Sequence, residues 1–292
     1  MEGIEHRVVE NGIKMHIAEI GKGPVVLFVH GFPELWYSWR HQMVSLAVQG
    51  YKAVAPDMRG YGDTDAPASS HCYTSFHIVG DLVVLIDLLG VYQVFVVGHD
   101  FGAYMAWHLC LFCADRVKAF VSTGLHFLRR DPFMKPIAAF QHLYGDDYDM
   151  CRFQRSLVVL VLIGRNGTDT VMKKLVTIFS KPGPPMLPKD TRFAMAPSTL
   201  PSWMSEEDLR YYASKFENTG LTGGLNYYRA FDLTWELSAP WTDAQIKVPV
   251  KLVVGELELM YNVPVVMEGV AHFIQQERPD EISKHIFDFI RK

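Results

Sequence analysis

The sequence has few of the features that mark metal-binding proteins. Only four of its 292 residues are cysteines, and Cys110 and Cys113 are the only two with a Cys-x-x-Cys spacing, which a zinc site of this type needs twice. We therefore expect free, buried thiols in a reducing compartment. No other motif calls for a metal or an organic cofactor, so we expect neither.

Long apolar runs are also absent. The longest uncharged one, Ser156 to Gly164, is less than half the roughly 20 residues that a membrane-spanning helix needs. The N-terminal segment MEGIEHRVVENG is polar and acidic, and it lacks the apolar segment of a secretory signal. We expect a cytoplasmic protein that does not enter a membrane.

No charge of one sign dominates the chain. The 28 Lys and Arg against 32 Asp and Glu give a net charge of −4, without a run of like charge that could hold a polyanion. Nucleic acid is therefore excluded as an expected partner. Hydrophobic residues make up 49% of the chain, and its length suits one large α/β domain or a core with an inserted subdomain.

What the sequence does contain is an alternation of strand and helix patterns in its first half. Val25–His30, Lys52–Ala55 and Val94–Gly98 are short β-branched runs typical of buried strands. Trp36–Gln49 and Ser75–Leu89 lie between them and have helical periodicity. This order predicts an α/β protein whose mostly parallel sheet carries helices on both faces.

The alternation stops after Val121. The proline-rich stretch Lys181–Pro201 and helical patterns over Ser205–Phe231 follow, and a strand pattern resumes only at Val248–Val254, before a final helix at Glu281–Ile290. We predict a core built from residues 1–130 and 246–292, with residues 131–245 inserted as a helical lid.

A candidate nucleophile lies at the end of the third strand pattern. Gly98-His99-Asp100-Phe101-Gly102 turns from this strand into the helix Tyr104–Phe112, the strand–turn–helix arrangement of a nucleophile elbow with Asp in place of Ser. A carboxylate that attacks an sp³ carbon forms an ester, which water can cleave, whereas serine would form a stable ether. Asp100 therefore indicates epoxide opening or halide displacement; the competing interpretation is a helix N-cap.

Several motifs together resemble those of soluble epoxide hydrolases, the plant type especially, over nearly the whole chain. They are Val29-His30-Gly31-Phe32-Pro33-Glu34, Asp57-Met58-Arg59-Gly60-Tyr61-Gly62, the elbow, Asn226-Tyr227-Tyr228-Arg229 and Ala271-His272-Phe273. The resemblance implies the α/β-hydrolase fold and a small apolar epoxide as substrate, such as a fatty-acid or aryl epoxide. It also implies a monomer or homodimer.

The resemblance assigns a role to each matching residue. Asp100 would attack the epoxide, His272 would activate water against the resulting ester, and Tyr228 would bind the epoxide oxygen and protonate it. The amides of Phe32 and Phe101 would form the oxyanion hole. The residues expected to shape or contact the substrate site are Pro33, Trp36 and Tyr228, whereas His30 and His99 are expected to support the backbone.

Two positions depart from the family pattern. Glu258 stands where the family has the aspartate that orients the histidine, and Glu256 is an alternative. In the predicted lid, Asp149 stands where the family has its second oxygen-binding tyrosine, and an aspartate donates no proton at neutral pH without a strongly raised pKa. We therefore name Tyr148, one place earlier, as a substitute.

The connection between Glu258 and the next apolar run, Val265–Met267, is the third departure. Only Leu259 to Pro264 lie between them, whereas a parallel crossover needs a dozen or more residues. Either residues have been omitted from this chain, which we favour, or the C-terminal strand is displaced and His272 does not reach Asp100.

Two other functions are weighed against epoxide hydrolysis. A haloalkane dehalogenase shares the aspartate elbow, but it uses an indole N–H after the nucleophile to hold the halide, and Phe101 has no such donor. A catalytically impaired homologue that only binds an apolar ligand would tolerate both the short connection and Asp149.

Overall fold

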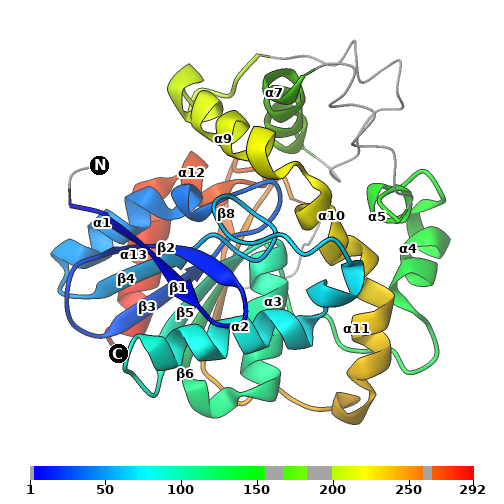
Figure 1. The fold of residues 1–292 in the computed structure, drawn as a ribbon, viewed down its shortest axis with the longest axis horizontal. Helices are drawn as coiled ribbons and strands as arrows, with labels where there is room; N and C mark the ends of the chain where they lie inside the picture. Colours follow the sequence, from blue (N-terminus) through cyan, green and yellow to red (C-terminus); the bar gives the residue numbers. More distant parts are fainter. Residues whose placement is uncertain (1–2, 155–166, 183–198, 259–264) are drawn as a thin grey trace.

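The computed structural model describes residues 3–154, 167–182, 199–258 and 265–292, and its centre is an eight-stranded sheet (Figure 1). The strands lie in the order β1-β2-β4-β3-β5-β6-β7-β8. Their bounds are β1 Glu5–Glu10, β2 Lys14–Ile20, β3 Val25–Val29, β4 Lys52–Pro56, β5 Val94–His99, β6 Val117–Thr123, β7 Val250–Gly255 and β8 Val266–Met267. The strands from β3 onwards pair in parallel, as predicted.

An antiparallel hairpin precedes the parallel strands, and the sequence-based prediction misses it. β1 pairs with β2, and β2 pairs antiparallel with β4. The turn contains Asn11-Gly12, and Gly12 has a φ of 92°, a conformation that glycine adopts without strain. An Asn-Gly pair between two alternating runs is the signal that could have revealed this hairpin.

Helices cover both faces of the sheet and form two cores. Val26 and Phe28 of β3 pack against α1 (Arg40–Val48) and α13 (Pro279–Ile290) on one face. Leu27 and Val29 face the opposite side, where they pack with α2 (Ser75–Leu88) and α3 (Phe101–Phe112). This alternation follows from the two-residue repeat of a strand and gives the predicted three layers (Figure 1).

The helix predicted from Trp36 begins as the 3₁₀ turn η1 (Trp36–Trp39), and α1 follows it. The other short helices of residues 1–130 and 246–292 are η2 Ser70–Tyr73, η3 Ala114–Arg116 and α12 Ile274–Glu277, and η4 Ala239–Trp241 lies between α11 (Phe231–Leu237) and β7.

A group of helices, here called the inserted helices, follows β6 and precedes β7, although these two strands are neighbours in the sheet. Figure 1 shows the group gathered on one side of the molecule. Its members are α4 Pro136–Tyr144, α5 Asp149–Arg152, α7 Thr168–Phe179, α9 Glu206–Thr219, α10 Thr222–Arg229 and α11 Phe231–Leu237. The helical pattern over Ser205–Phe231 is interrupted at Gly220, which has a φ of 68°.

The C-terminal strand is not displaced from the sheet. β8 pairs in parallel with β7, with Val254 opposite Val266 and Gly255 opposite Met267. The amide of Leu257 also donates a hydrogen bond of 3.0 Å to the carbonyl of Val270. The short connection itself, residues 259–264, lies outside the described residues, as does most of the proline-rich stretch.

All four cysteines are free, and two of them, Cys110 and Cys151, are buried as expected, whereas Cys72 and Cys113 are half-buried. Among the described helices, none has the length and apolar character to cross a bilayer.

Helix α3 approaches β3 so closely that only glycine fits at one position of the contact. A Cβ atom on Gly102 would lie 2.1 Å from the carbonyl oxygen of Val29 and 2.5 Å from that of His30. Both oxygens belong to the backbone of the core, so neither can move without shifting the strand end.

We predict that Gly102→Ala lowers the free energy of unfolding by about 3 kcal/mol, because the methyl group overpacks this contact. Gly80→Ala is the matched control, since Gly80 lies in α2 with no atom within 4 Å of its added Cβ. This control should raise stability by about 0.5–1 kcal/mol. Urea denaturation measures both changes, and similar shifts in the two variants would contradict the packing argument.

Candidate active site

Asp100 occupies a strained turn between β5 and α3. Its backbone has φ 49° and ψ −125°, whereas most non-glycine residues avoid positive φ. The side chain makes no capping hydrogen bond to α3, so the N-cap interpretation does not describe it. The strain instead presents the carboxylate beyond the end of the strand, as a nucleophile elbow requires.

The Asp100 carboxylate meets the loop that follows β3. The amide of Phe32 donates a hydrogen bond of 2.9 Å to Oδ2 of Asp100. A Cβ on Gly31 would lie 2.5 Å from the same oxygen, so this close approach requires glycine. Phe101 is the first residue of α3, and the first N–H groups of a helix have no hydrogen-bond partner within the helix. Both amides predicted for the oxyanion hole thus flank Asp100.

His272 and Glu258 form a carboxylate–imidazole pair. Nδ1 of His272 lies 2.5 Å from Oε1 of Glu258, and both side chains are largely buried. The alternative acid, Glu256, instead accepts a hydrogen bond of 2.8 Å from the amide of Gly269. Burial alone would lower the pKa of His272, but the charge and hydrogen bond of Glu258 outweigh it and raise the pKa above its usual value.

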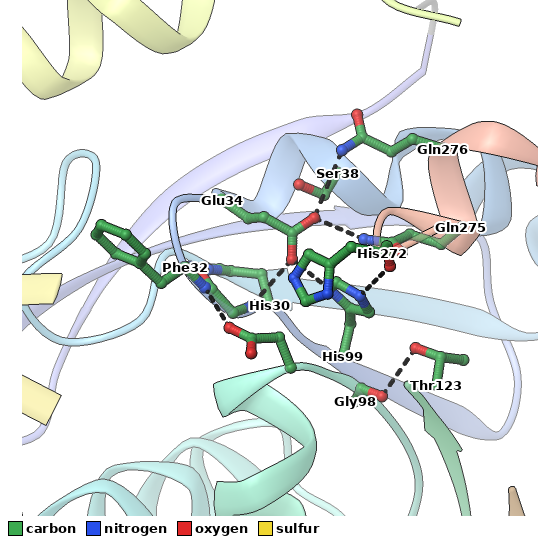
Figure 2. A network of polar contacts seen from close by, with 12 residues as sticks. His30, Phe32, Glu34, Ser38, Gly98, His99, Thr123, His272, Gln275 and Gln276 are labelled. Atoms are coloured by element: carbon green, nitrogen blue, oxygen red, sulfur yellow. Dashed lines mark hydrogen bonds and ion pairs between the residues drawn. The ribbon is translucent and has the colours of Figure 1, made fainter. Parts of the chain in front are cut away.

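A buried polar network holds the backbone of His272 (Figure 2). The two ring nitrogens of His99 lie 2.6 Å from Oε2 of Glu34 and 2.8 Å from the carbonyl oxygen of His272. Since both neighbours are acceptors, His99 donates from both nitrogens and carries a positive charge. Burial opposes this charge, but Glu34 raises the pKa of His99 well above its usual value.

Glu34 is the centre of this network. Its Oε1 accepts a hydrogen bond of 2.6 Å from the Gln275 amide group, and its Oε2 accepts one of 3.2 Å from the Gly31 amide. The Glu34 carboxylate therefore connects two segments. One is the loop before Phe32, whose amide binds Asp100, and the other is the segment after His272. The sequence reveals the motif that contains Glu34 but not its side-chain partners, because His99 lies 65 and Gln275 lies 241 residues further along the chain.

His30 has the supporting role expected from the sequence. Its Nδ1 donates to the Gly31 carbonyl at 2.9 Å, and its Nε2 accepts a hydrogen bond of 2.9 Å from the Met58 amide.

A cavity of about 180 Å³ opens beside the catalytic candidates. Asp100, Glu258 and His272 supply its polar side. Aromatic and aliphatic side chains from α3, the segment after β6 and the inserted helices supply the rest, and they are Phe101, Tyr104, Leu125, Leu128, Phe140, Tyr144, Tyr148, Met150 and Phe231. Most of these lining residues lie in segments without a recognisable motif, so the sequence did not reveal them. The cavity suits an apolar molecule with one polar reacting group.

Tyr228 reaches a second, smaller cavity from α10. This cavity is also lined by Asp100 and His272. The Tyr228 ring packs edge-on against Phe101, with 4.4 Å between the ring centroids. Burial, together with the negative charge of Asp100, raises the pKa of Tyr228 well above its usual value, so the phenol keeps its proton.

Tyr148 and Asp149 line this smaller cavity as well. Tyr148 is buried, and burial raises its pKa, so it too stays protonated. The Asp149 carboxylate lies 3.2 Å from the guanidinium of Arg152. The structure therefore brings the substitute tyrosine named from the sequence into the same space as Tyr228.

Trp36 and Pro33, which the sequence names as substrate contacts, are not among the described residues that line these two cavities. The Trp36 indole N–H donates a hydrogen bond of 2.8 Å to the Tyr211 hydroxyl, and its ring packs against His6 and Tyr37. Pro33 is buried behind the loop that carries the Phe32 amide.

The fold, the aspartate elbow and the imidazole–carboxylate pair together define an α/β hydrolase. A family model described as alpha/beta hydrolase fold matches residues 24–180. Epoxide hydrolase 2 of Siraitia grosvenorii is 53% identical over 316 positions, which cover all of both chains. An epoxide hydrolase of Caballeronia sordidicola is 36% identical over 98% of this chain and 93% of its own.

Solved structures agree with these relatives. An epoxide hydrolase from Vigna radiata has a TM-score of 0.93 and 52% identity, covering 100% of this chain and 98% of that chain. A variant of potato epoxide hydrolase has a TM-score of 0.92 and 48% identity, covering 99% of each chain. The chain belongs to the epoxide hydrolase family of α/β hydrolases.

The relative from Siraitia grosvenorii aligns over more positions than this chain has residues. Its alignment has 316 positions, 24 more than the 292 residues of this chain. The alternative weighed from the sequence, a displaced C-terminal strand that keeps His272 from Asp100, does not hold, because β8 pairs with β7 and both residues line the same cavity.

We predict that Glu258→Gln lowers the pKa of His272 by about one unit or more, because it removes the neighbouring negative charge. The imidazole would then lose its proton at lower pH than in the parent protein. Glu256→Gln is the control, since Glu256 bonds to Gly269 instead. An NMR pH titration of labelled histidine measures both values, and equal shifts in the two variants would show that Glu258 is not the partner.

Proposed function

We propose that the protein opens epoxides to vicinal diols through a covalent ester on Asp100. The observation that carries this proposal is the placement of an aspartate elbow, an imidazole and a buried tyrosine on adjoining cavities with apolar walls. A carboxylate nucleophile suits attack on an sp³ carbon, and a protonated tyrosine suits the alkoxide that leaves.

In the first step, an Asp100 carboxylate oxygen attacks one epoxide carbon, and the bond from that carbon to the epoxide oxygen breaks. The oxygen takes the hydroxyl proton of Tyr228, which leaves a hydroxyalkyl ester on Asp100. Tyr148 is proposed as a second donor to the same oxygen, because it is protonated and lines the same cavity.

In the second step, His272 removes a proton from water as the water attacks the ester carbonyl carbon. The Phe32 and Phe101 amides stabilise the oxyanion that forms. When it collapses, the bond from the carbonyl carbon to the alcohol oxygen breaks, and that oxygen takes the proton of the new carboxyl group, so the diol leaves and the Asp100 carboxylate is restored. The proton that His272 took from water then passes by way of solvent to the Tyr228 phenolate, which returns both groups to their starting states. Glu258 holds the ring of His272 and stabilises the imidazolium during this step.

The cavity walls favour an apolar substrate, and we propose a fatty-acid or aryl epoxide. We also propose that residues 131–245 act as a lid on a core of residues 1–130 and 246–292. This division is supported by the inserted helices, which supply Tyr228 and much of the apolar cavity wall. The free cysteines suit a reducing compartment such as the cytoplasm.

We predict that His272→Gln accumulates the ester on Asp100, because attack needs no base whereas hydrolysis does. Incubation with an aryl epoxide should add the mass of one substrate to the intact protein, and diol release should fall by about a thousandfold or more. Asp100→Asn is the control and should show neither adduct nor diol. In the parent protein, bromide release from a bromoalkane without diol from the epoxide would indicate a dehalogenase, and release of neither product would indicate a binding protein.

We predict that Tyr228→Phe slows formation of the ester by about a hundredfold or more while binding of the epoxide changes little, because it removes a proton donor to the leaving oxygen. Single-turnover kinetics separates the two quantities. Tyr148→Phe tests the second donor and should produce a smaller loss in the same step. If binding weakens and the rate does not change, Tyr228 shapes the cavity and is not the acid.

A further inference from the structure

Two histidines meet on the hairpin at the edge of the sheet, outside the residues that line the cavity of Asp100. Nδ1 of His6 in β1 lies 3.0 Å from Nε2 of His16 in β2. The two rings are nearly parallel, with 5.2 Å between their centroids. Two imidazole nitrogens this close share either a proton or a cation.

The other nitrogen of His16 is held by a buried carboxylate. Nδ1 lies 2.8 Å from Oδ2 of Asp57, while Oδ1 of Asp57 accepts a hydrogen bond of 3.0 Å from the Trp36 amide. Asp57 thus fixes the ring of His16 and its tautomer, with the N–H on Nδ1 and the lone pair on Nε2. A histidine that binds a metal is usually oriented by a carboxylate in this way.

Asp63 lies close to His16 and Asp57. One ligand atom from each of His16, Asp57 and Asp63 lies within 4.8 Å of the other two. Asp63 and His6 are exposed, so their side chains can adjust around an ion, whereas His16 and Asp57 are buried and fixed. Two imidazoles and a carboxylate are ligands that suit Zn²⁺.

We propose that His6, His16 and Asp63 form a binding site for a divalent transition-metal ion such as Zn²⁺, with Asp57 orienting His16 and water completing the coordination. The sequence predicts no metal because these ligands come from separate segments without a recognisable spacing. The site is independent of the proposed epoxide chemistry.

A bound ion would compete with a lysine for one of these ligands. The ammonium group of Lys215, in α9, forms an ion pair with Oδ2 of Asp63. Zn²⁺ must take this carboxylate from Lys215, and the two cations repel each other. Lys215 therefore weakens Zn²⁺ binding at this site. Its removal should tighten binding only if Asp63 is a ligand, and this effect distinguishes the site from two histidines that bind Zn²⁺ by chance.

Calorimetric titration of the purified protein with Zn²⁺, in a buffer that does not chelate it, tests the site. We expect one equivalent to bind, His6→Ala to weaken binding at least tenfold, and Lys215→Ala to tighten it about threefold or more. His71→Ala is the matched control, because His71 is also exposed but lies outside the cluster, and it should bind Zn²⁺ as the parent does.

The thermal midpoint gives a second readout that does not depend on activity. Zn²⁺ should raise it in the parent and in His71→Ala, but not in His6→Ala, because an ion that binds the folded state stabilises it. Equal Zn²⁺ affinity in the parent and His6→Ala would overturn the proposal. A loss of affinity in Lys215→Ala would overturn the assignment of Asp63 as a ligand.

Discussion

The structure depends on the conformation of one residue, Asp100. Its positive φ costs on the order of 1–3 kcal/mol and persists only because the surrounding backbone enforces it. The enforcing contact is the close approach of α3 to β3, where Gly102 lies against the carbonyl oxygens of Val29 and His30. The same approach brings the Phe32 amide to the Asp100 carboxylate, so helix packing and the geometry of the site have one cause.

A second constraint keeps the histidine in place. Glu34 and His99 are buried charges that stabilise each other, and together they bond to the carbonyl of His272 and to Gln275, three residues after it. A buried pair of this kind is costly to break, because removing one partner leaves an uncompensated charge. The pair therefore does more than fill the core: it fixes the backbone from which the His272 ring reaches Glu258 and the cavity.

The departures from the family pattern have different consequences for the site. The short connection after Glu258 leaves the pair of Glu258 and His272 intact. The strands before and after this connection, β7 and β8, are held together by their parallel pairing. Asp149 changes the chemistry of the smaller cavity, since it places an acid paired with Arg152 where the family has a phenol. Tyr148 enters the same cavity from the neighbouring position, so a second hydroxyl is retained there.

The sequence by itself determined the parallel core and the elbow at Asp100, because strand periodicity and tight turns depend on neighbouring residues. His272 was named through the resemblance of Ala271-His272-Phe273 to the family motif. The sequence could not place Trp36, reveal the partners of Glu34 or decide whether Glu258 reaches His272. Those outcomes depend on contacts between residues far apart in the chain. Only the tertiary structure decided them, since side-chain direction and distance are set by how the helices pack on the sheet.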